Sequence, residues 1–313
     1  MTYEPLTFRA GAGAHAADCH AWHFAGAGDT LATSTGRPVV VMAHGLGGTK
    51  DSGLEPFAEA LSKAGLDVLA FDYRGFGSSG GVPRQTVSVT AQVEDYRAAM
   101  RAAAALPGVD GQRLVLWGVS LGGGHVLSAG ADRDDVAAVV SLTPLVDGLA
   151  AGRHALASHK TSSVARSTVA GVRSRLATAR GREPVMMPIA GRPGDVAALT
   201  LPGSYEAYLA LAGPTWRNEV DAAIGLELGR IRPGRAAAAL RAPLLVQIAD
   251  FDRSAPPYAA AKAAFKGRAE VRHYPCDHFD VWPGNSWFEP AAGHQVAFLT
   301  RHLTPAASPT GVG

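Results

Sequence analysis

Cysteine is almost absent from the chain, whose 313 residues include only Cys19 and Cys276. Two cysteines are too few for a disulfide framework, and we expect both to be reduced thiols. Long apolar runs are also missing, and none approaches the roughly 20 residues that a membrane-spanning helix needs. The N-terminal residues show no basic segment followed by an apolar one, so no signal peptide is predicted. These absences favour a cytoplasmic protein with no membrane span.

Charge of one sign is not in excess, because 29 Lys and Arg residues stand against 27 Asp and Glu residues. A nucleic-acid-binding protein would show a dominant basic surface, so no nucleic-acid partner is expected. The sequence also contains no H-E-x-x-H motif, no C-x-x-C pair and no phosphate-binding P-loop. No metal or other cofactor is therefore implied. Apolar residues make up 47% of the chain, which is ample for a large buried core.

Short apolar runs alternate with helical patterns along most of the chain. Continuous Val, Leu and Ile runs indicate strands that are covered on both faces. Their alternation with helices predicts an α/β fold with a mostly parallel sheet and helices on both faces. The expected parallel strands are residues 37–44, 66–72, 113–118, 136–144, 242–250 and 269–275, and antiparallel edge strands are expected near residues 6–9 and 19–24.

One interval breaks this alternation. Almost a hundred residues separate the strand at 136–144 from the strand at 242–250, far more than an ordinary connection with one helix needs. The interval is helix-prone and shows no clear pattern of parallel strands. We interpret residues 146–235 as an inserted helical cap over the functional edge of the sheet. The core domain would then comprise residues 1–145 and 236–313.

The stretch LWGVSLGGGH (116–125) places one serine among glycines, directly after an expected strand. G-x-S-x-G between a strand and a helix predicts a sharp turn that projects the Ser120 hydroxyl out of the sheet. Gly118 and Gly122 carry no Cβ, so strand and helix can approach closely. Free N–H groups at the helix N-terminus then point at the reacting atom. Ser120 is the candidate nucleophile and the Leu121 N–H a candidate oxyanion donor; the alternative is an ordinary glycine-rich helix start.

A serine nucleophile needs a base, and the base needs an orienting acid. His278 follows the last expected strand, at the edge where open α/β sheets place their chemistry, and is the candidate base. The alternative is a histidine in a surface loop. Asp252 is favoured as the acid because it lies deeper in its loop than Asp250, which can organise the turn. Weaker candidates for the base, which lie in expected helices or in the cap, are His125, His154, His159, His294 and His302.

A second oxyanion donor is expected from the loop HGLGGTK (44–50), which follows the strand at 37–44. Its glycines let backbone amides turn inward, and the Leu46 N–H is the candidate. The alternative is a plain glycine-rich turn.

Five motifs follow one another along the chain: HGLGG, FDYRGFGSSGG (71–81), GVSLGG, DFDRSAPP and CDHFDVW. In this order and spacing they resemble the α/β-hydrolase superfamily, and more closely its bacterial esterases and dienelactone-hydrolase-like enzymes. The resemblance covers nearly the whole chain outside the cap. It implies an α/β-hydrolase fold with Ser120 as nucleophile, Asp252 as acid and His278 as base. Leu46 and Leu121 match the oxyanion donors.

The same resemblance implies that Asp72 and Arg74 have a packing and hydrogen-bonding role rather than a catalytic one. The long cap departs from the minimal, capless pattern, so no substrate is transferred from the family. The elbow carries Ser120 where dehalogenases and epoxide hydrolases carry Asp, which disfavours their chemistry.

The expected function is hydrolysis of a small-molecule carboxylic ester through an acyl-enzyme on the Ser-His-Asp triad. Amide or peptide hydrolysis, thioester hydrolysis and acyl transfer use the same machinery, and the fold alone does not choose among them. A non-catalytic binding protein on this scaffold is a more remote alternative. Whether the chain forms a homo-oligomer stays open.

The cap offers two features that could bear on the substrate. Residues 148–182 contain no Asp or Glu, which indicates either a solvated helix face or a positive rim that attracts anionic esters. The seven basic residues of this segment are Arg153, Lys160, Arg166, Arg173, Arg175, Arg180 and Arg182. Candidates for an apolar substrate pocket, with the cap's own core as the alternative, are Met186, Met187, Tyr205, Tyr208 and Trp216. Cys276, two residues before His278, is interpreted as a small buried packing residue.

Overall fold

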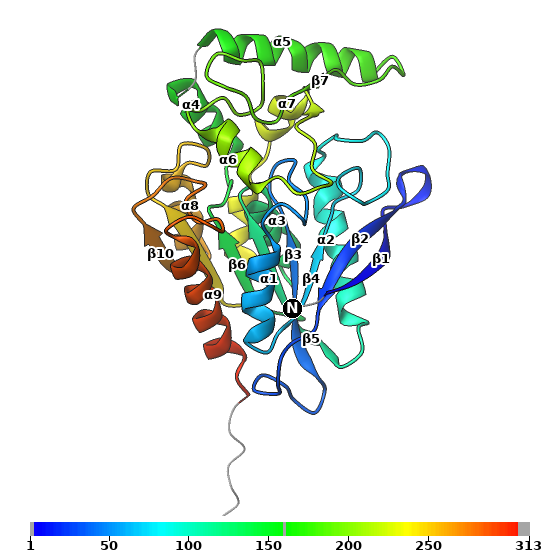
Figure 1. The fold of residues 1–313 in the computed structure, drawn as a ribbon, viewed down its shortest axis with the longest axis vertical. Helices are drawn as coiled ribbons and strands as arrows, with labels where there is room; N and C mark the ends of the chain where they lie inside the picture. The colour runs from blue at the N-terminus through cyan, green and yellow to red at the C-terminus, as the bar shows by residue number, and fades with distance from the viewer. Residues whose placement is uncertain (1–2, 159–160, 306–313) are drawn as a thin grey trace, which may run out of the picture.

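The structure, a computed structural model, describes residues 3–158 and 161–305. Within them one eight-stranded sheet forms the centre of the molecule, in the order β1-β2-β4-β3-β5-β6-β9-β10 (Figure 1). Its strands are β1 (Glu4–Ala10), β2 (Ala17–Phe24), β3 (Arg37–Ala43), β4 (Asp67–Phe71), β5 (Val109–Val119), β6 (Val136–Leu142), β9 (Leu244–Ala249) and β10 (Glu270–Tyr274).

All neighbouring strands from β4 to β10 run parallel, and β1 and β2 add an antiparallel edge. The prediction of a mostly parallel sheet with antiparallel edge strands near the N-terminus is therefore confirmed. The two edge strands are longer than predicted. Their residues alternate between buried and exposed positions, so their apolar pattern is weaker and their ends were missed in the sequence.

Helices cover both faces of the sheet. On one face lie α1 (Glu55–Lys63) and α9 (Phe288–Leu303), and on the other lie α2 (Val89–Ala104), α3 (Leu121–Gly130) and α8 (Pro257–Lys266). In β3, Val39 and Val41 pack on the α2 side, whereas Val40 and Met42 pack on the α1 side. Both faces of the strand are buried, so every position must be apolar, and this is why the strand appears in the sequence as a continuous apolar run.

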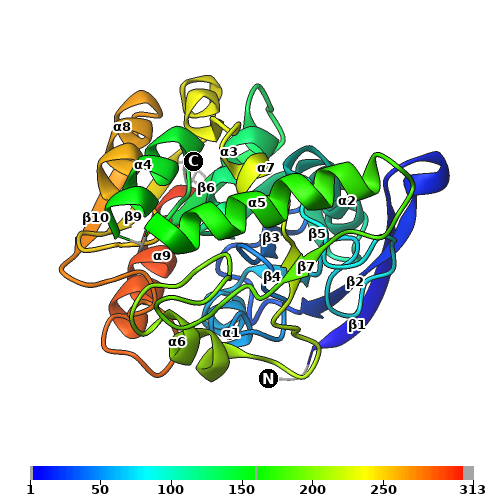
Figure 2. The same cartoon turned by 90° about the horizontal axis from the view of Figure 1, so that it is seen from above.

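Residues 143–243 lie between β6 and β9 and are called the insertion below. Its elements are α4 (Gly148–Ser158), α5 (Thr161–Thr178), β7 (Met186–Met187), α6 (Ser204–Leu211), β8 (Val220–Asp221), α7 (Ile224–Leu228) and the 3₁₀ helix η2 (Pro233–Ala239). Helix α5 is the outermost of them (Figure 1), and seen from above it crosses over the edge of the sheet (Figure 2). Among the helices within residues 3–158 and 161–305, none is both long and apolar enough to cross a membrane.

Helix α3 packs closely on the strands beneath it because two glycines leave room for it. A Cβ on Gly118 would lie 2.2 Å from the carbonyl oxygen of Gly122, and a Cβ on Gly122 would lie 2.6 Å from the carbonyl oxygen of His44. Both contacts are with main chain, which cannot move aside as a flexible side chain can. The α3 N-terminus can therefore reach this position only with glycine at both places.

This packing predicts that Gly118→Ala lowers the free energy of unfolding by about 1–3 kcal/mol or more, as overpacking does elsewhere. Urea denaturation measures the change. Gly293→Ala is the matched control, because Gly293 lies inside α9 with open space around it. We expect that variant to gain roughly 0.5–1 kcal/mol from helix propensity. Equal stability of Gly118→Ala and the wild type would contradict the analysis.

Candidate active site

Ser120 sits at the junction of β5 and α3 with φ 55° and ψ −118°. A non-glycine residue in such a conformation costs about 1–3 kcal/mol and persists only where the surroundings impose it. Here the main chain imposes it from both sides. The Ser120 N–H donates to the Leu142 carbonyl at 2.9 Å, and the Ser120 carbonyl accepts from the Leu145 N–H at 2.8 Å. The sharp turn predicted from G-x-S-x-G is thus present.

His278 and Asp252 form a buried pair at the ends of neighbouring strands. His278 Nδ1 lies 2.6 Å from Asp252 Oδ2, and the residues are 5% and 3% exposed. The other carboxylate oxygen, Oδ1, accepts from the amides of Ser254 at 2.7 Å and Ala255 at 2.6 Å, which fixes its orientation. Burial by itself lowers the pKa of His278. The charge and hydrogen bond of Asp252 outweigh burial, so this pKa lies above its ordinary value of 6.5.

The other candidates for acid and base are engaged elsewhere. Asp250 meets the surface residue His273 at 2.6 Å and does not contact His278. His125 of α3 bonds to Gln92 of α2, and burial lowers the pKa of His125 to about 3. His294 bonds to the Tyr274 hydroxyl, His302 packs on Phe298, and His154 bonds to the Asp252 carbonyl. His159 lies outside the described residues.

A cavity of about 280 Å³ joins these groups to the insertion. Ser120 and His278 line it, together with Leu46 and Leu121. No hydrogen bond joins the side chains of Ser120 and His278 within the described part of the chain. Such contacts are often long before a substrate binds. Because Asp252 occupies Nδ1, Nε2 is the nitrogen of His278 that is left for Ser120.

The loop after β3 passes directly over Ser120. A Cβ on Gly45 would lie 2.8 Å from Ser120 Cβ, so only glycine permits this approach. The Leu46 carbonyl accepts a hydrogen bond from Tyr208 of α6 at 3.0 Å. Among the described residues, the main-chain N–H groups of Leu46 and Leu121 have no hydrogen-bond acceptor. Both N–H groups are therefore unpaired within the described part of the chain, and Leu46 and Leu121 line the cavity together with Ser120.

His44 holds the start of this loop. Its Nδ1 accepts from the Gly45 N–H at 2.8 Å, and its Nε2 lies 3.0 Å from the Ser52 carbonyl. These partners require a neutral ring with the proton on Nε2. Burial lowers the pKa of His44 to about 4, which keeps the ring neutral at ordinary pH. Trp282 stacks on it with ring centroids 4.8 Å apart. His44 begins the HGLGG motif, but the motif alone gave no reason to assign this histidine a role.

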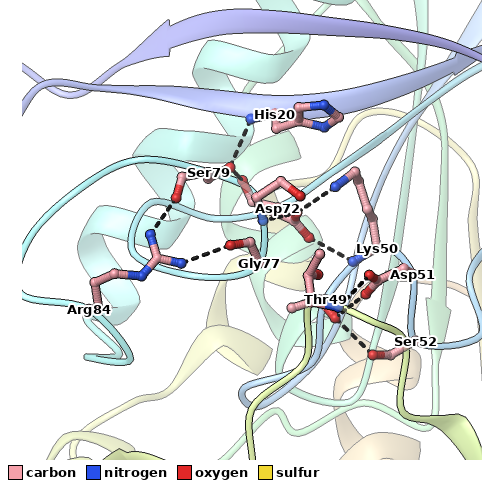
Figure 3. Close-up of polar contacts among 11 residues, drawn as sticks. His20, Thr49, Lys50, Asp51, Ser52, Asp72, Gly77, Ser79 and Arg84 are labelled. Atoms are coloured by element: carbon pink, nitrogen blue, oxygen red, sulfur yellow. Dashed lines mark hydrogen bonds and ion pairs between the residues drawn. The ribbon is translucent and has the colours of Figure 1, made fainter.

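A buried ion pair holds the end of the loop (Figure 3). Lys50 Nζ donates to Asp72 Oδ2 at 2.6 Å, and the Lys50 amide donates to Oδ1 at 2.7 Å. The Ser78 amide also donates to Oδ2, and Trp22 lies under the ammonium group with its ring 4.9 Å from Nζ. The two side chains are 1% and 0% exposed. Asp72 thus forms buried hydrogen bonds and an ion pair, as a packing and hydrogen-bonding residue would, but no sequence pattern predicted Lys50 as its partner.

Arg74, the second residue given a structural role, pairs with Asp95 of α2 through its guanidinium, and its amide donates to Asp95 Oδ2 at 3.0 Å. It lies away from the cavity lining.

The insertion is tied at several points to the loops that carry Asp252 and His278. His154 Nε2 lies 3.0 Å from the carbonyl oxygen of Asp252. Arg253 pairs with Asp277, next to His278, and also donates to the Pro202 carbonyl at 3.2 Å. These contacts join the loops after β9 and β10 to the insertion, whose helices α4 and α5 form the part of the cavity wall called the roof below.

The cavity contains two of the five candidate pocket residues. Met187 and Tyr208 line it. Met186 points outward and is 37% exposed, while Tyr205 lies under the Arg192 guanidinium at 4.6 Å. Trp216 stacks behind Tyr208 and does not reach the cavity. One-residue alternation along β7 separates Met187 from Met186, and the sequence had no signal for that short strand.

The basic residues of segment 148–182 lie elsewhere. None of the six that the structure describes lines the cavity, and Lys160 lies outside the described residues. Arg175 lies 3.6 Å from Glu227, and Arg166 donates to the Gly194 carbonyl. In the described part of the chain no three His, Cys, Asp or Glu side chains gather as metal ligands. Burial raises the pKa of the Cys276 thiol to about 12, which leaves it unreactive.

Comparisons with known proteins identify relatives of this chain. The family described as "Serine aminopeptidase, S33" matches residues 34–185. The "Quorum-quenching protein AidA" of Acinetobacter baumannii is 37% identical over 272 residues, which cover 86% of this chain and 88% of that protein. "Thiohydrolase aneE" of Aspergillus aculeatus is 33% identical over 157 residues, half of this chain and 49% of that protein.

Among solved structures, that of DcsB in complex with its substrate analogue superposes with a TM-score of 0.76 at 21% identity. The match covers 97% of this chain and all of that one. Fold, elbow and full-length similarity lead to one conclusion: the chain belongs to the α/β-hydrolase superfamily. It is thus a member of a hydrolase family, with relatives named for more than one activity.

The buried ion pair behind the loop predicts a large effect on stability. Lys50→Met leaves the Asp72 carboxylate buried without its cation, and loss of one partner of a buried pair costs about 3–5 kcal/mol. Adding Asp72→Asn removes the stranded charge and should restore part of the loss. Urea denaturation measures both variants. Lys63→Met, which removes an exposed pair with Glu59 on α1, should cost less than about 1 kcal/mol. A double variant less stable than either single one would refute this account.

Proposed function

We propose that the protein is a serine hydrolase that cleaves carboxylic esters of small, largely apolar molecules through an acyl-enzyme. The observation that carries the proposal is the buried His278–Asp252 pair, which opens with Ser120 onto one cavity. The cavity is lined mainly by Leu, Ala and Gly residues, which suit an uncharged chain.

The geometry supports a definite sequence of steps. His278 Nε2 accepts the Ser120 proton as Oγ attacks the acyl carbon, and Asp252 stabilises the imidazolium that forms. The N–H groups of Leu46 and Leu121 donate to the developing oxyanion. The alcohol leaves with the proton from His278. Water then gives a proton to His278 and attacks the acyl-enzyme, and His278 returns this proton to Ser120 Oγ as the bond to the acyl group breaks and the acid leaves.

The cavity lining favours an ester over an aminopeptidase substrate. Recognition of a substrate amine calls for a carboxylate, and the lining residues that the structure describes include no Asp or Glu. Its one permanent cation, Arg253, is already paired with Asp277. A neutral substrate therefore fits this wall better than an amine or an anion.

Thioester hydrolysis is the second candidate, because half of the chain is similar to a protein named as a thiohydrolase. The same triad and oxyanion donors serve both reactions. A panel of esters, thioesters and amides with one common acyl chain separates them by kcat/KM. Because a longer match is named for quorum quenching, small molecules used in quorum signalling belong in the panel.

Ser120→Ala should remove almost all turnover, because the triad acts as a unit and only the oxyanion donors and binding remain. We expect a loss of roughly 10⁴–10⁶-fold in kcat. A fluorophosphonate probe should label the wild type at Ser120 and leave the variant unlabelled. Ser128→Ala, at an α3 serine outside the cavity lining, is the control and should be labelled like the wild type. Full activity of Ser120→Ala would overturn the proposal.

The raised pKa of His278 predicts where activity is lost in acid. The base must be neutral, so kcat/KM falls as the pH drops through the pKa of His278, and the midpoint should lie above 6.5. Asp252→Asn removes the charge that raises this pKa, so the residual activity should persist to lower pH while kcat falls by about 10⁴. A pH profile with an activated ester measures both. A midpoint at or below 6.5 in the wild type would contradict the assignment.

A further inference from the structure

The roof of the cavity carries hydroxyl groups from one face of α5. Ser163, Ser167 and Thr168 all line the cavity. Thr168 Oγ1 donates to the Val164 carbonyl at 2.8 Å, and Ser167 Oγ donates to the Ala197 carbonyl at 3.4 Å. Both hydroxyls are therefore occupied by the protein itself.

Ser163 differs from its neighbours. It is 3% exposed, and its Oγ is buried without a hydrogen-bond partner. Within residues 3–158 and 161–305, it is the only cavity-lining residue with such an orphaned buried side-chain atom. A buried hydroxyl left unpaired is costly, and an exception of this kind calls for a partner that the protein alone does not supply.

The surroundings of Ser163 define what that partner can be. The nearby helix α4 contributes Ala151, Gly152 and Ala155 to the lining, none of which has a side chain that can hydrogen-bond. The one guanidinium in the lining, that of Arg253, is held by Asp277. Among the lining residues that the structure describes, none offers a free counter-charge to a charged group at Ser163, and desolvation of such a group would oppose binding. The partner must be neutral and polar.

We propose that Ser163 is a specificity-determining residue that hydrogen-bonds a neutral polar group, a keto, hydroxyl or amide group, carried by the substrate away from its scissile ester. The inference rests on the proposed function, because the proposed function places the carbonyl of the scissile ester at Ser120. Ser120 immediately precedes α3, whereas Ser163 belongs to α5, and α5 lies on the far side of the insertion from the sheet (Figure 1). The substrate class is thus an ester with an apolar chain interrupted by one uncharged polar group.

The test compares matched esters that differ in one group. The straight-chain acyl ester is set against isomers that bear a single keto or hydroxyl group at successive chain positions. In the wild type, one position should raise kcat/KM over the unsubstituted ester by roughly tenfold. Ser163→Ala should abolish that ratio. Thr168→Val is the matched control, since its hydroxyl is already bonded within α5 and the ratio should persist.

Two outcomes overturn the inference: a wild type that prefers no substituted chain, or a Ser163→Ala variant that keeps the ratio. Neither touches the proposed function, which stands if the wild type cleaves the unsubstituted ester and Ser120→Ala does not. If no ester is cleaved, the primary amides of the same chains are titrated calorimetrically into Ser120→Ala and Ser120→Ala/Ser163→Ala. The polar isomer should then bind the first protein roughly tenfold more tightly than the second. Equal affinities would rule out the contact.

Discussion

The strained backbone of Ser120 is the constraint on which the rest of the site depends. A serine with φ 55° would relax in an unfolded chain, so the folded core must hold it against that tendency. β6 and the segment after it do so through hydrogen bonds to both sides of the peptide, and the loop after β3 closes over it through Gly45. The rigidity of the parallel sheet therefore fixes one side chain in the lining of a cavity.

The remaining groups of the site come from separate strands. Asp252 follows β9 and His278 follows β10, and parallel strands bring both loops to the same edge. The loop after β3 is fastened at its two ends by different means, a neutral buried histidine at His44 and a buried ion pair at Lys50. The first needs an uncharged ring and the second needs two full charges. A single fold thus combines opposite electrostatic environments within seven residues of chain.

Much of this arrangement could be predicted from the sequence. The doubly buried strands appear as continuous apolar runs, and the elbow and the loops after β9 and β10 are local features that short motifs describe. Asp252 was favoured over Asp250 because it lies deeper in its loop. In the structure Asp252 contacts His278, whereas Asp250 contacts His273. The cavity wall was less accessible. Whether Met187 or Met186 faces inward depends on a two-residue strand, and the lone hydroxyl of Ser163 becomes distinctive only once its neighbours are known.

The contacts between the insertion and the loop after β9 link two properties that are usually treated apart. His154 of α4 is hydrogen-bonded to the main chain of Asp252, and the adjacent Arg253 is hydrogen-bonded to the Pro202 carbonyl. A displacement of the insertion would therefore also displace the Asp252 carboxylate, which is bonded to the His278 ring. The position of the insertion and the geometry of the Asp252–His278 pair are therefore coupled through the main chain of one loop, and neither can change independently of the other.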